Sequence, residues 1–242
     1  MERLGVGDPR VEARGVHLFE RIVETGSVVL RTLGGTRAGE VAVQRWLSSP
    51  RVTTAAILEA SSVRTRSACA GRRVVAAQDT TEINFARYAR RRGLGPGGDG
   101  KTPGFFLHCV VAIDADEEAV LGLVDARIWT RDVAPVKPRA SRPIEEKESM
   151  RWIEGAQAAS QRLPDAAQLV VVGAQEADIW ACFARRPSGT DLLIGARHDR
   201  PLLAGHLVTA PPSAPDLITR VLVSAQRTCA MSPSAATRAL RT

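Results

Sequence analysis

Residues 74–81 read Val-Val-Ala-Ala-Gln-Asp-Thr-Thr, an apolar run that ends in a polar cluster. A short run of this kind is typical of a strand buried on both faces of a sheet. Asp79 stands at the carboxyl end of the predicted strand, where the functional groups of an open α/β sheet tend to gather. The stretch therefore predicts the first strand of a sheet with a carboxylate at its functional edge.

The chain that follows predicts the rest of a mixed α/β sheet. Further strands are expected at residues 105–114, 119–130, 169–173 and 192–196. The first two of these read as an antiparallel hairpin, because an acidic turn separates them. Helices are expected at residues 144–162 and 176–185, and a glycine-rich loop is expected at 93–104.

The chain before this sheet reads as helical. Helices are expected at residues 11–25 and 37–47, and a third begins near Thr53. Four arginines are scattered on this part, which resembles a small DNA-binding bundle: Arg10, Arg14, Arg37 and Arg45. An ordinary helical subdomain with solvated charges explains the same pattern equally well.

Three regions follow from these patterns: a helical domain at 1–70, a sheet core at 71–208 and a poorly defined tail at 209–242. Within the tail, residues 216–227 predict one amphipathic helix with Leu217, Val221 and Ala225 on one face.

The composition is that of a basic, arginine-rich globular chain. Its 242 residues carry a net charge of +7, and 44% of them are hydrophobic, enough for a packed core. The planar guanidinium group of arginine can bind a phosphate through two hydrogen bonds, so the positive charge favours a polyanionic partner. A genome-wide bias toward arginine, with no special partner, is the simpler explanation of the same composition.

The sequence also indicates a cytoplasmic location. No apolar run approaches the roughly 18 residues of a membrane span, and the first residues lack the apolar stretch of a signal peptide. The four cysteines are scattered, which suggests reduced thiols: Cys69, Cys109, Cys182 and Cys229.

Asp79 by itself is more simply a turn or capping residue than a ligand of a divalent cation. A two-metal site needs several carboxylates that converge from different elements. The natural position of a second carboxylate follows the 169–173 strand, where the sequence reads Ala174-Gln175-Glu176.

His108, on a predicted strand, is expected to be a packed core histidine.

An ordered series of short motifs resembles the insertion-sequence-four family of bacterial cut-and-paste transposases. The series covers nearly the whole chain and comprises Gly7-Asp8-Pro9-Arg10, Arg14, Arg45-Trp46, Gln78-Asp79-Thr80-Thr81, Gly104-Phe105-Phe106-Leu107-His108, Glu146-Lys147-Glu148-Ser149, Arg151-Trp152 and Glu176-Ala177-Asp178-Ile179. The resemblance implies an amino-terminal DNA-binding helical domain and a ribonuclease H-like core. It also implies an Asp-Asp-Glu triad that holds two Mg²⁺ ions for DNA strand cleavage and strand transfer. Arg197 and His198 fall in a strand-end loop that is expected to touch phosphate.

The departures from this family lie at the triad. The second aspartate falls on Ala174, whose methyl group cannot ligate a cation, and the third acid lies downstream of any residue aligned here. Asp79 alone remains, so Mg²⁺ binding is expected to be weak or absent.

We therefore expect an incomplete ribonuclease H-like core and a transposase-like protein that binds transposon ends without cutting them. The alternatives are a DNA-binding regulator that interferes with a full-length transposase, and a gene remnant without function.

Overall fold

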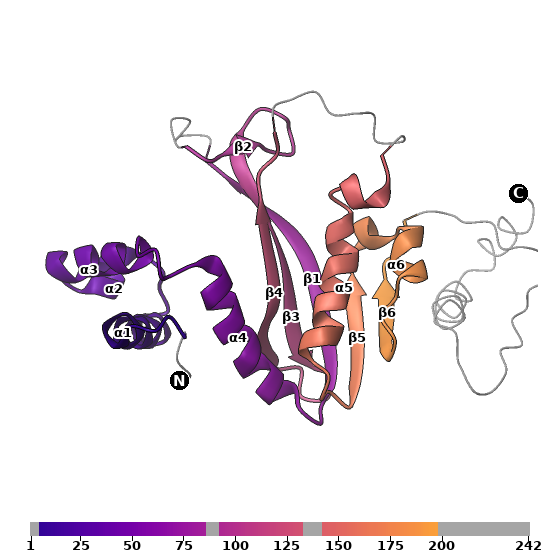
Figure 1. Ribbon diagram of the computed structural model, residues 1–242, viewed down its shortest axis with the longest axis horizontal. Coiled ribbons are helices and arrows are strands. Elements are labelled where there is room, and N and C mark those ends of the chain that lie inside the picture. Colours follow the sequence, from indigo (N-terminus) through magenta and orange to yellow (C-terminus); the bar gives the residue numbers. More distant parts are fainter. Residues whose placement is uncertain (1–4, 86–91, 133–141, 198–242) are drawn as a thin grey trace, which may run out of the picture.

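The computed structural model describes residues 5–85, 92–132 and 142–197, which form a mixed α/β structure with six α-helices and one mixed sheet (Figure 1). His198 and the whole 209–242 tail lie outside the described residues, as does most of the loop that follows residue 132. Within the described ranges, no helix is both long and apolar enough to cross a membrane.

The sheet combines an antiparallel part with a parallel part. Strand β3 (Pro103–Asp114) runs antiparallel to both β1 (Arg73–Asn84) and β4 (Val120–Trp129). Strands β5 (Gln168–Gly173) and β6 (Thr190–Ile194) are parallel to β1. The order across the sheet is β4-β3-β1-β5-β6, and a two-residue strand β2 (Gly95–Pro96) pairs with the start of β3.

The expected strands are confirmed, with shifted ends. The last strand begins two residues earlier than predicted, at Thr190, because its buried positions are Thr190, Leu192 and Ile194. The predicted glycine-rich loop at 93–104 is wrong in part, since it contains β2 and the first two residues of β3. Pairing between these strands supplies hydrogen bonds that a loop would have to find elsewhere.

Helices α4 (Thr54–Cys69) and α5 (Met150–Arg162) lie along one face of the sheet (Figure 1). Alternate strand residues point to that face, including Val74, Val110 and Val171, and all three are at most 1% exposed. They pack with Trp152 and Ile153 of α5 in the main core. Period-two burial of this kind places one set of side chains under the helices and the other set on the opposite face.

A second, smaller core holds three helices together: α1 (Pro9–Thr25), α2 (Leu30–Gly34) and α3 (Arg37–Leu47). Its buried members are Leu18, Leu33, Val43 and Trp46. Two features of the sequence set the helix starts, because Asp8 caps α1 just before Pro9, and Thr36 caps α3. The five-residue helix α2 was not predicted, since it is too short to show a helical period.

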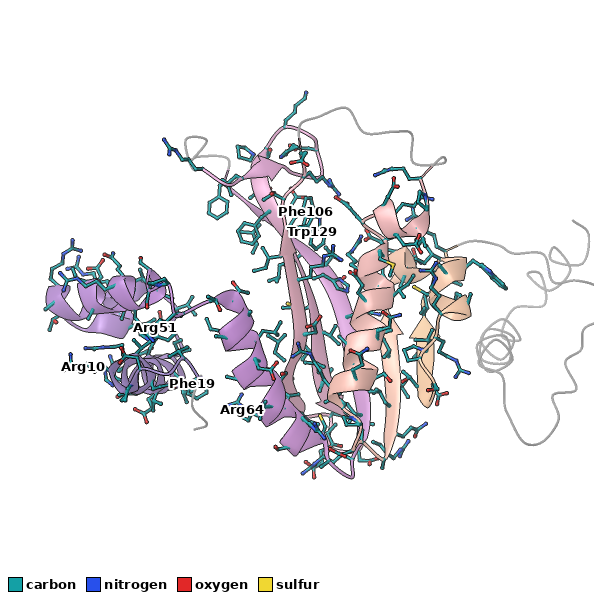
Figure 2. All side chains as sticks on the ribbon, viewed as in Figure 1. Arg10, Phe19, Arg51, Arg64, Phe106 and Trp129 are labelled. Carbon is teal, nitrogen blue, oxygen red and sulfur yellow. The ribbon has the colours of Figure 1, made fainter. Side chains whose placement is uncertain are left out.

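Helix α4 packs on the sheet rather than into the small core. Its Thr65 hydroxyl donates to the carbonyl oxygen of Leu123 at 2.9 Å, and Cys69 is fully buried in the main core. The Arg64 guanidinium lies 5.5 Å from the ring centre of Phe19 in α1 (Figure 2), so a cation–π contact connects the helices of the two cores.

The two helices predicted within the sheet region are both interrupted. Residues 144–162 divide into a 3₁₀ helix η2 (Ile144–Glu146) and α5, with Lys147 in extended conformation between them. Residues 176–185 divide into η3 (Gln175–Ala177) and α6 (Trp180–Ala184). Tertiary contacts explain the breaks, because Glu148 and the buried Asp178 stand at the interruptions and bond to groups from other elements.

Candidate functional site

Asp79, in the middle of β1, and Ala174, the first residue after β5, lie side by side on the sheet. The last paired residues of these parallel strands are Gln78 and Gly173, so Asp79 and Ala174 are the next residue on each strand. Gln78 points to α5, where its amide donates to the Trp152 carbonyl oxygen. Asp79 therefore points to the opposite face. Ala174 keeps an extended backbone, with φ −68° and ψ 179°, so its methyl group points to the same face as Asp79.

Asp79 is exposed and makes no hydrogen bond or ion pair with another described residue. The expectation that it caps a turn is wrong, because Asp79 lies inside β1 and pairs in register with Cys109 of β3. A solvated carboxylate is therefore available at this edge of the sheet.

A chain of hydrogen bonds leads from this edge into the core. Arg151 Nε donates to Thr80 Oγ1 at 2.7 Å, and Thr80 Oγ1 lies 2.8 Å from His108 Nδ1. On the other side of the ring, His108 Nε2 lies 3.2 Å from Gln78 Oε1. Because the Gln78 oxygen only accepts, His108 carries its proton on Nε2, and Thr80 then donates to Nδ1.

His108 is a buried neutral histidine, and the expectation of a packed core residue is confirmed. The side chain is 2% exposed and lies edge-on to Trp152, with ring centres 4.8 Å apart. Burial first, and then the positive charge of Arg151, lower the pKa of His108 to about 4, against the smaller opposite effect of Asp79. A neutral ring suits the hydrogen-bond chain, which needs Nδ1 as an acceptor.

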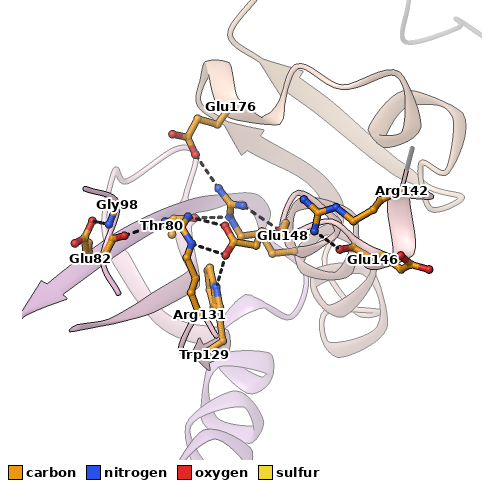
Figure 3. Close-up of polar contacts among 11 residues, drawn as sticks. Thr80, Glu82, Gly98, Trp129, Arg131, Arg142, Glu146, Glu148 and Glu176 are labelled. Carbon is orange, nitrogen blue, oxygen red and sulfur yellow. Dashed lines mark hydrogen bonds and ion pairs between the residues drawn. The ribbon is translucent and has the colours of Figure 1, made fainter. Parts of the chain in front are cut away.

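Two arginine–glutamate pairs lie beside this chain (Figure 3). Arg131 binds Glu148 through two hydrogen bonds of 2.6 and 2.7 Å, and its guanidinium lies 4.1 Å from the ring centre of Phe106. Arg151 Nη2 binds Glu176 at 2.7 Å. The hydrogen bond from Arg131 lowers the pKa of Glu148, so this carboxylate stays ionised. Each arginine thus has a carboxylate partner.

The acidic residues near Ala174 do not replace the missing carboxylate. Glu176 is held by Arg151, and Asp178 is 4% exposed with its Oδ2 accepting from the Arg197 amide at 2.8 Å. Among the described residues, no group of three or more His, Cys, Asp or Glu side chains is placed to hold a metal ion. The donor set therefore does not fit a pair of Mg²⁺ ions, which needs several shared carboxylate oxygens.

The predicted DNA-contacting arginines lie on the amino-terminal helices. Arg10 and Arg14 are exposed on α1 and Arg45 is exposed on α3, while Arg37 forms an exposed ion pair with Glu40 at 2.9 Å. A pocket between α1 and the α2–α3 segment includes Arg14 in its lining, together with His17 and Arg21. The four predicted DNA-contacting arginines therefore all lie on the amino-terminal helices, far from Asp79 in the sequence.

Arg197, the last described residue, lies after β6 at the same carboxyl edge of the sheet as Ala174. Gly195 connects the two strands, because its amide donates to the Gly173 carbonyl oxygen at 3.1 Å. The predicted partner of Arg197 in phosphate contact, His198, lies outside the described residues.

Sequence reasoning missed Arg131 as a member of the site, while Gln78 and Thr80 lie in the matched segment around Asp79. Arg151 and Glu148 belong to the matched Glu-Lys-Glu-Ser and Arg-Trp segments, and this spacing was the available signal for them. No local sequence pattern indicates that Arg131 belongs to the site, because its partner Glu148 lies 17 positions further along the chain, beyond a loop.

No family model matches the chain, and a search of curated proteins found no match either.

Proposed function

We propose that this chain is a transposase-like DNA-binding protein with a ribonuclease H-like core that no longer cleaves DNA. The observation that carries the proposal is the position of Asp79 and Ala174, each of which directly follows the last registered pair of β1 and β5, Gln78 and Gly173. Asp79 and Ala174 are the two positions at which the motif series expects the first and second acids of a triad.

Agreement between motif order and geometry supports the core assignment. The two motifs are 95 positions apart in the sequence, yet their key residues are neighbours on one face of the sheet. A chance resemblance in short motifs has no reason to produce this juxtaposition.

The loss of cleavage follows from the donor set. Mg²⁺ is usually held by one or two carboxylates together with substrate phosphates, and it releases water reluctantly. Asp79 supplies one carboxylate, Ala174 supplies none, and Glu176 is neutralised by Arg151. This edge of the sheet therefore offers too few carboxylate oxygens to bind two Mg²⁺ ions that share an oxygen ligand.

DNA binding is supported by charge and exposure. Arg10, Arg14 and Arg45 are exposed on the amino-terminal helices, and the whole chain carries a net charge of +7. Exposed guanidinium groups on one small helical domain suit the phosphates of a duplex.

The binding experiment measures the affinity of the full chain for a mixed-sequence duplex at several salt concentrations, by fluorescence anisotropy. We expect affinity to fall steeply with salt, since bound phosphates release counterions. Replacing Arg10, Arg14 and Arg45 with alanine together should reduce the slope of log K against log salt by about 3. The matched control replaces two exposed, ion-paired arginines of the sheet region, Arg66 and Arg73, and should leave the slope within about 1 of the parent value. Salt-independent binding, or equal slopes for both variants, would reject the DNA-binding assignment.

The cleavage experiment incubates the same duplex with Mg²⁺ or Mn²⁺. We expect no nicking above that of the Asp79→Asn variant. Nicking by the parent chain that disappears in Asp79→Asn would contradict the loss of activity and leave the DNA-binding assignment intact.

A further inference from the structure

The pocket between α1 and the α2–α3 segment is lined by basic and apolar residues, and no carboxylate belongs to its lining. Its basic members lie on one side of α1 at helical spacing: Arg14, His17 and Arg21. We call this cavity the α1 pocket. A concave surface that gathers positive groups without a counter-charge concentrates anions from solution.

Two of the basic groups, Arg14 and His17, are free to contact a ligand. Both side chains are exposed, and neither forms a hydrogen bond or ion pair with another described residue. They are three positions apart on α1, so their side chains lie next to each other on the helix surface. A guanidinium group has five N–H donors and an imidazole has at least one, so the pair can donate to one acceptor group from two directions.

The third basic group, Arg21, holds the pocket together. Its Nε donates to the Leu33 carbonyl oxygen at 3.4 Å, and its Nη2 donates to the Thr32 carbonyl oxygen at 3.3 Å. Its Nη1 binds Glu24 at 2.6 Å. These bonds connect α1 to α2 across the cavity. Arg21 is therefore a positioning residue, and its ion pair leaves the charge of Arg14 without a counter-ion inside the pocket.

The opposite wall is formed by two glycines whose backbones touch. A Cβ at Gly39 would overlap the Gly34 carbonyl oxygen, and a Cβ at Gly34 would overlap the Glu40 amide nitrogen. The helices α2 and α3 approach this closely only because both positions lack a side chain. The remaining lining residues belong to the small core: Leu18, Leu33 and Val43. The α1 pocket is therefore formed before any ligand arrives.

The size of the cavity limits the ligand to a compact group. Its volume is about 40 Å³, and a single water molecule needs roughly 10–15 Å³ by the same measure. The pocket thus has room for a few heavy atoms, which excludes a nucleobase or a sugar ring. A tetrahedral phosphate group satisfies both this limit and the charge, because its oxygens can accept from a guanidinium and an imidazole at once.

We propose that the α1 pocket binds a phosphate group, with Arg14 and His17 as the donors. The inference does not depend on DNA binding, because a free phosphate and the backbone phosphate of a nucleic acid present the same oxygens to the pocket. It assigns a ligand contact to His17 and separates the role of Arg14 from that of the other exposed arginines of the amino-terminal helices.

The experiment titrates inorganic phosphate into the full chain at constant pH and constant ionic strength, with chloride as the balancing anion. The readout is the proton NMR resonance of the His17 imidazole, which its loss in His17→Gln identifies. We expect this resonance to shift with phosphate and to reach saturation, and we expect no saturable shift with chloride. This measurement uses the unchanged chain, so it does not depend on the folding of a variant.

Two matched variants test whether the binding belongs to the pocket. Arg14→Gln removes a charged donor from the lining and should weaken phosphate binding about tenfold. Arg31→Gln removes an exposed charge of the same domain that does not belong to the lining, and its affinity should stay within about twofold of the parent value. Equal weakening in both variants would overturn the proposal, because it would indicate general attraction to a basic surface. A His17 resonance that does not respond to phosphate, or that responds equally to chloride, would also overturn it.

A mixed-sequence duplex in the same titration distinguishes the two sources of phosphate. We expect the duplex to displace inorganic phosphate and to shift the His17 resonance itself, which identifies a backbone phosphate as the ligand. A duplex that binds while phosphate stays in the pocket identifies a free phosphate group instead. If the duplex does not bind, the DNA-binding assignment fails, and saturation by inorganic phosphate still supports the α1 pocket.

Discussion

Restoring a carboxylate at position 174 tests the geometry on which the functional proposal depends. In Ala174→Asp, the new carboxylate follows Gly173 on β5, as Asp79 follows Gln78 on β1. Neighbouring strand axes are about 4.8 Å apart, so the two carboxylates face each other at close range. We expect the variant to bind a divalent cation that the parent chain binds weakly or not at all.

Without metal, the substitution should destabilise the protein slightly. Two unit charges about 5 Å apart repel by about 0.8 kcal/mol in a water-like environment and by about 3 kcal/mol at an effective dielectric of 20. Residues 79 and 174 are both exposed, so the lower value applies. We expect the free energy of unfolding at neutral pH to fall by about 1 kcal/mol, which lowers the melting temperature by about 2–4 °C in a domain of this size.

Manganese should reverse this loss. For a two-carboxylate site with a dissociation constant of about 1 mM, 10 mM free Mn²⁺ stabilises the folded state by about 1.4 kcal/mol. The assay is thermal unfolding of Ala174→Asp in chelator and in Mn²⁺, combined with Mn²⁺ electron paramagnetic resonance to count bound ions.

The matched control is Ala174→Asn, which has the same shape without the charge. We expect it to show neither the loss in chelator nor the recovery in Mn²⁺, and Asp79→Asn in the Ala174→Asp background should remove the recovery. An equal Mn²⁺ response in Ala174→Asn, or none in Ala174→Asp, would refute the placement of residues 79 and 174 as facing neighbours.

Three further perturbations test the rest of the structure. The buried neutral His108 has a pKa of about 4, so below the ordinary histidine value of about 6.5 the unfolded chain binds more protons than the folded chain. The free energy of unfolding should therefore fall by about 3 kcal/mol as the pH drops from 6.5 to 4. A urea-denaturation series in which His108→Gln shows the same dependence of stability on pH would contradict this. Arg151→Met should lower the free energy of unfolding by about 2–3 kcal/mol, because it removes the donor to Thr80 and the charge beside Glu176. Glu176→Gln changes a side chain that is 61% exposed, so it should lower the free energy of unfolding by under about 1 kcal/mol in the same urea-denaturation experiment. Trp46→Phe should cost about 1 kcal/mol by removing the indole donor to a backbone oxygen of α1, measured by hydrogen exchange of the amino-terminal helices, and unchanged protection there would contradict the role of this bond.

Most strands and long helices could be predicted from the sequence, because local patterns determine them. The apolar run at 74–77 and the helical patterns of 11–25 and 37–47 act over a few residues, and β1, α1 and α3 appear where those signals predict them. The interrupted helices at 144–162 and 176–185 show the limit of this reasoning. Their breaks depend on partners distant in sequence, such as Arg131 for Glu148 and the Arg197 amide for Asp178.

The amino-acid sequence by itself determined that Asp79 ends an apolar run, that position 174 lacks an acid, and that the chain is basic. These are properties of single residues and short windows. Only the tertiary structure decided that residues 79 and 174 are neighbours, that His108 is neutral within a directed hydrogen-bond chain, and that one face of the sheet lies outside the core. Strand order and register bring distant residues together, and long-range pairing of this kind leaves no periodic signal in the chain.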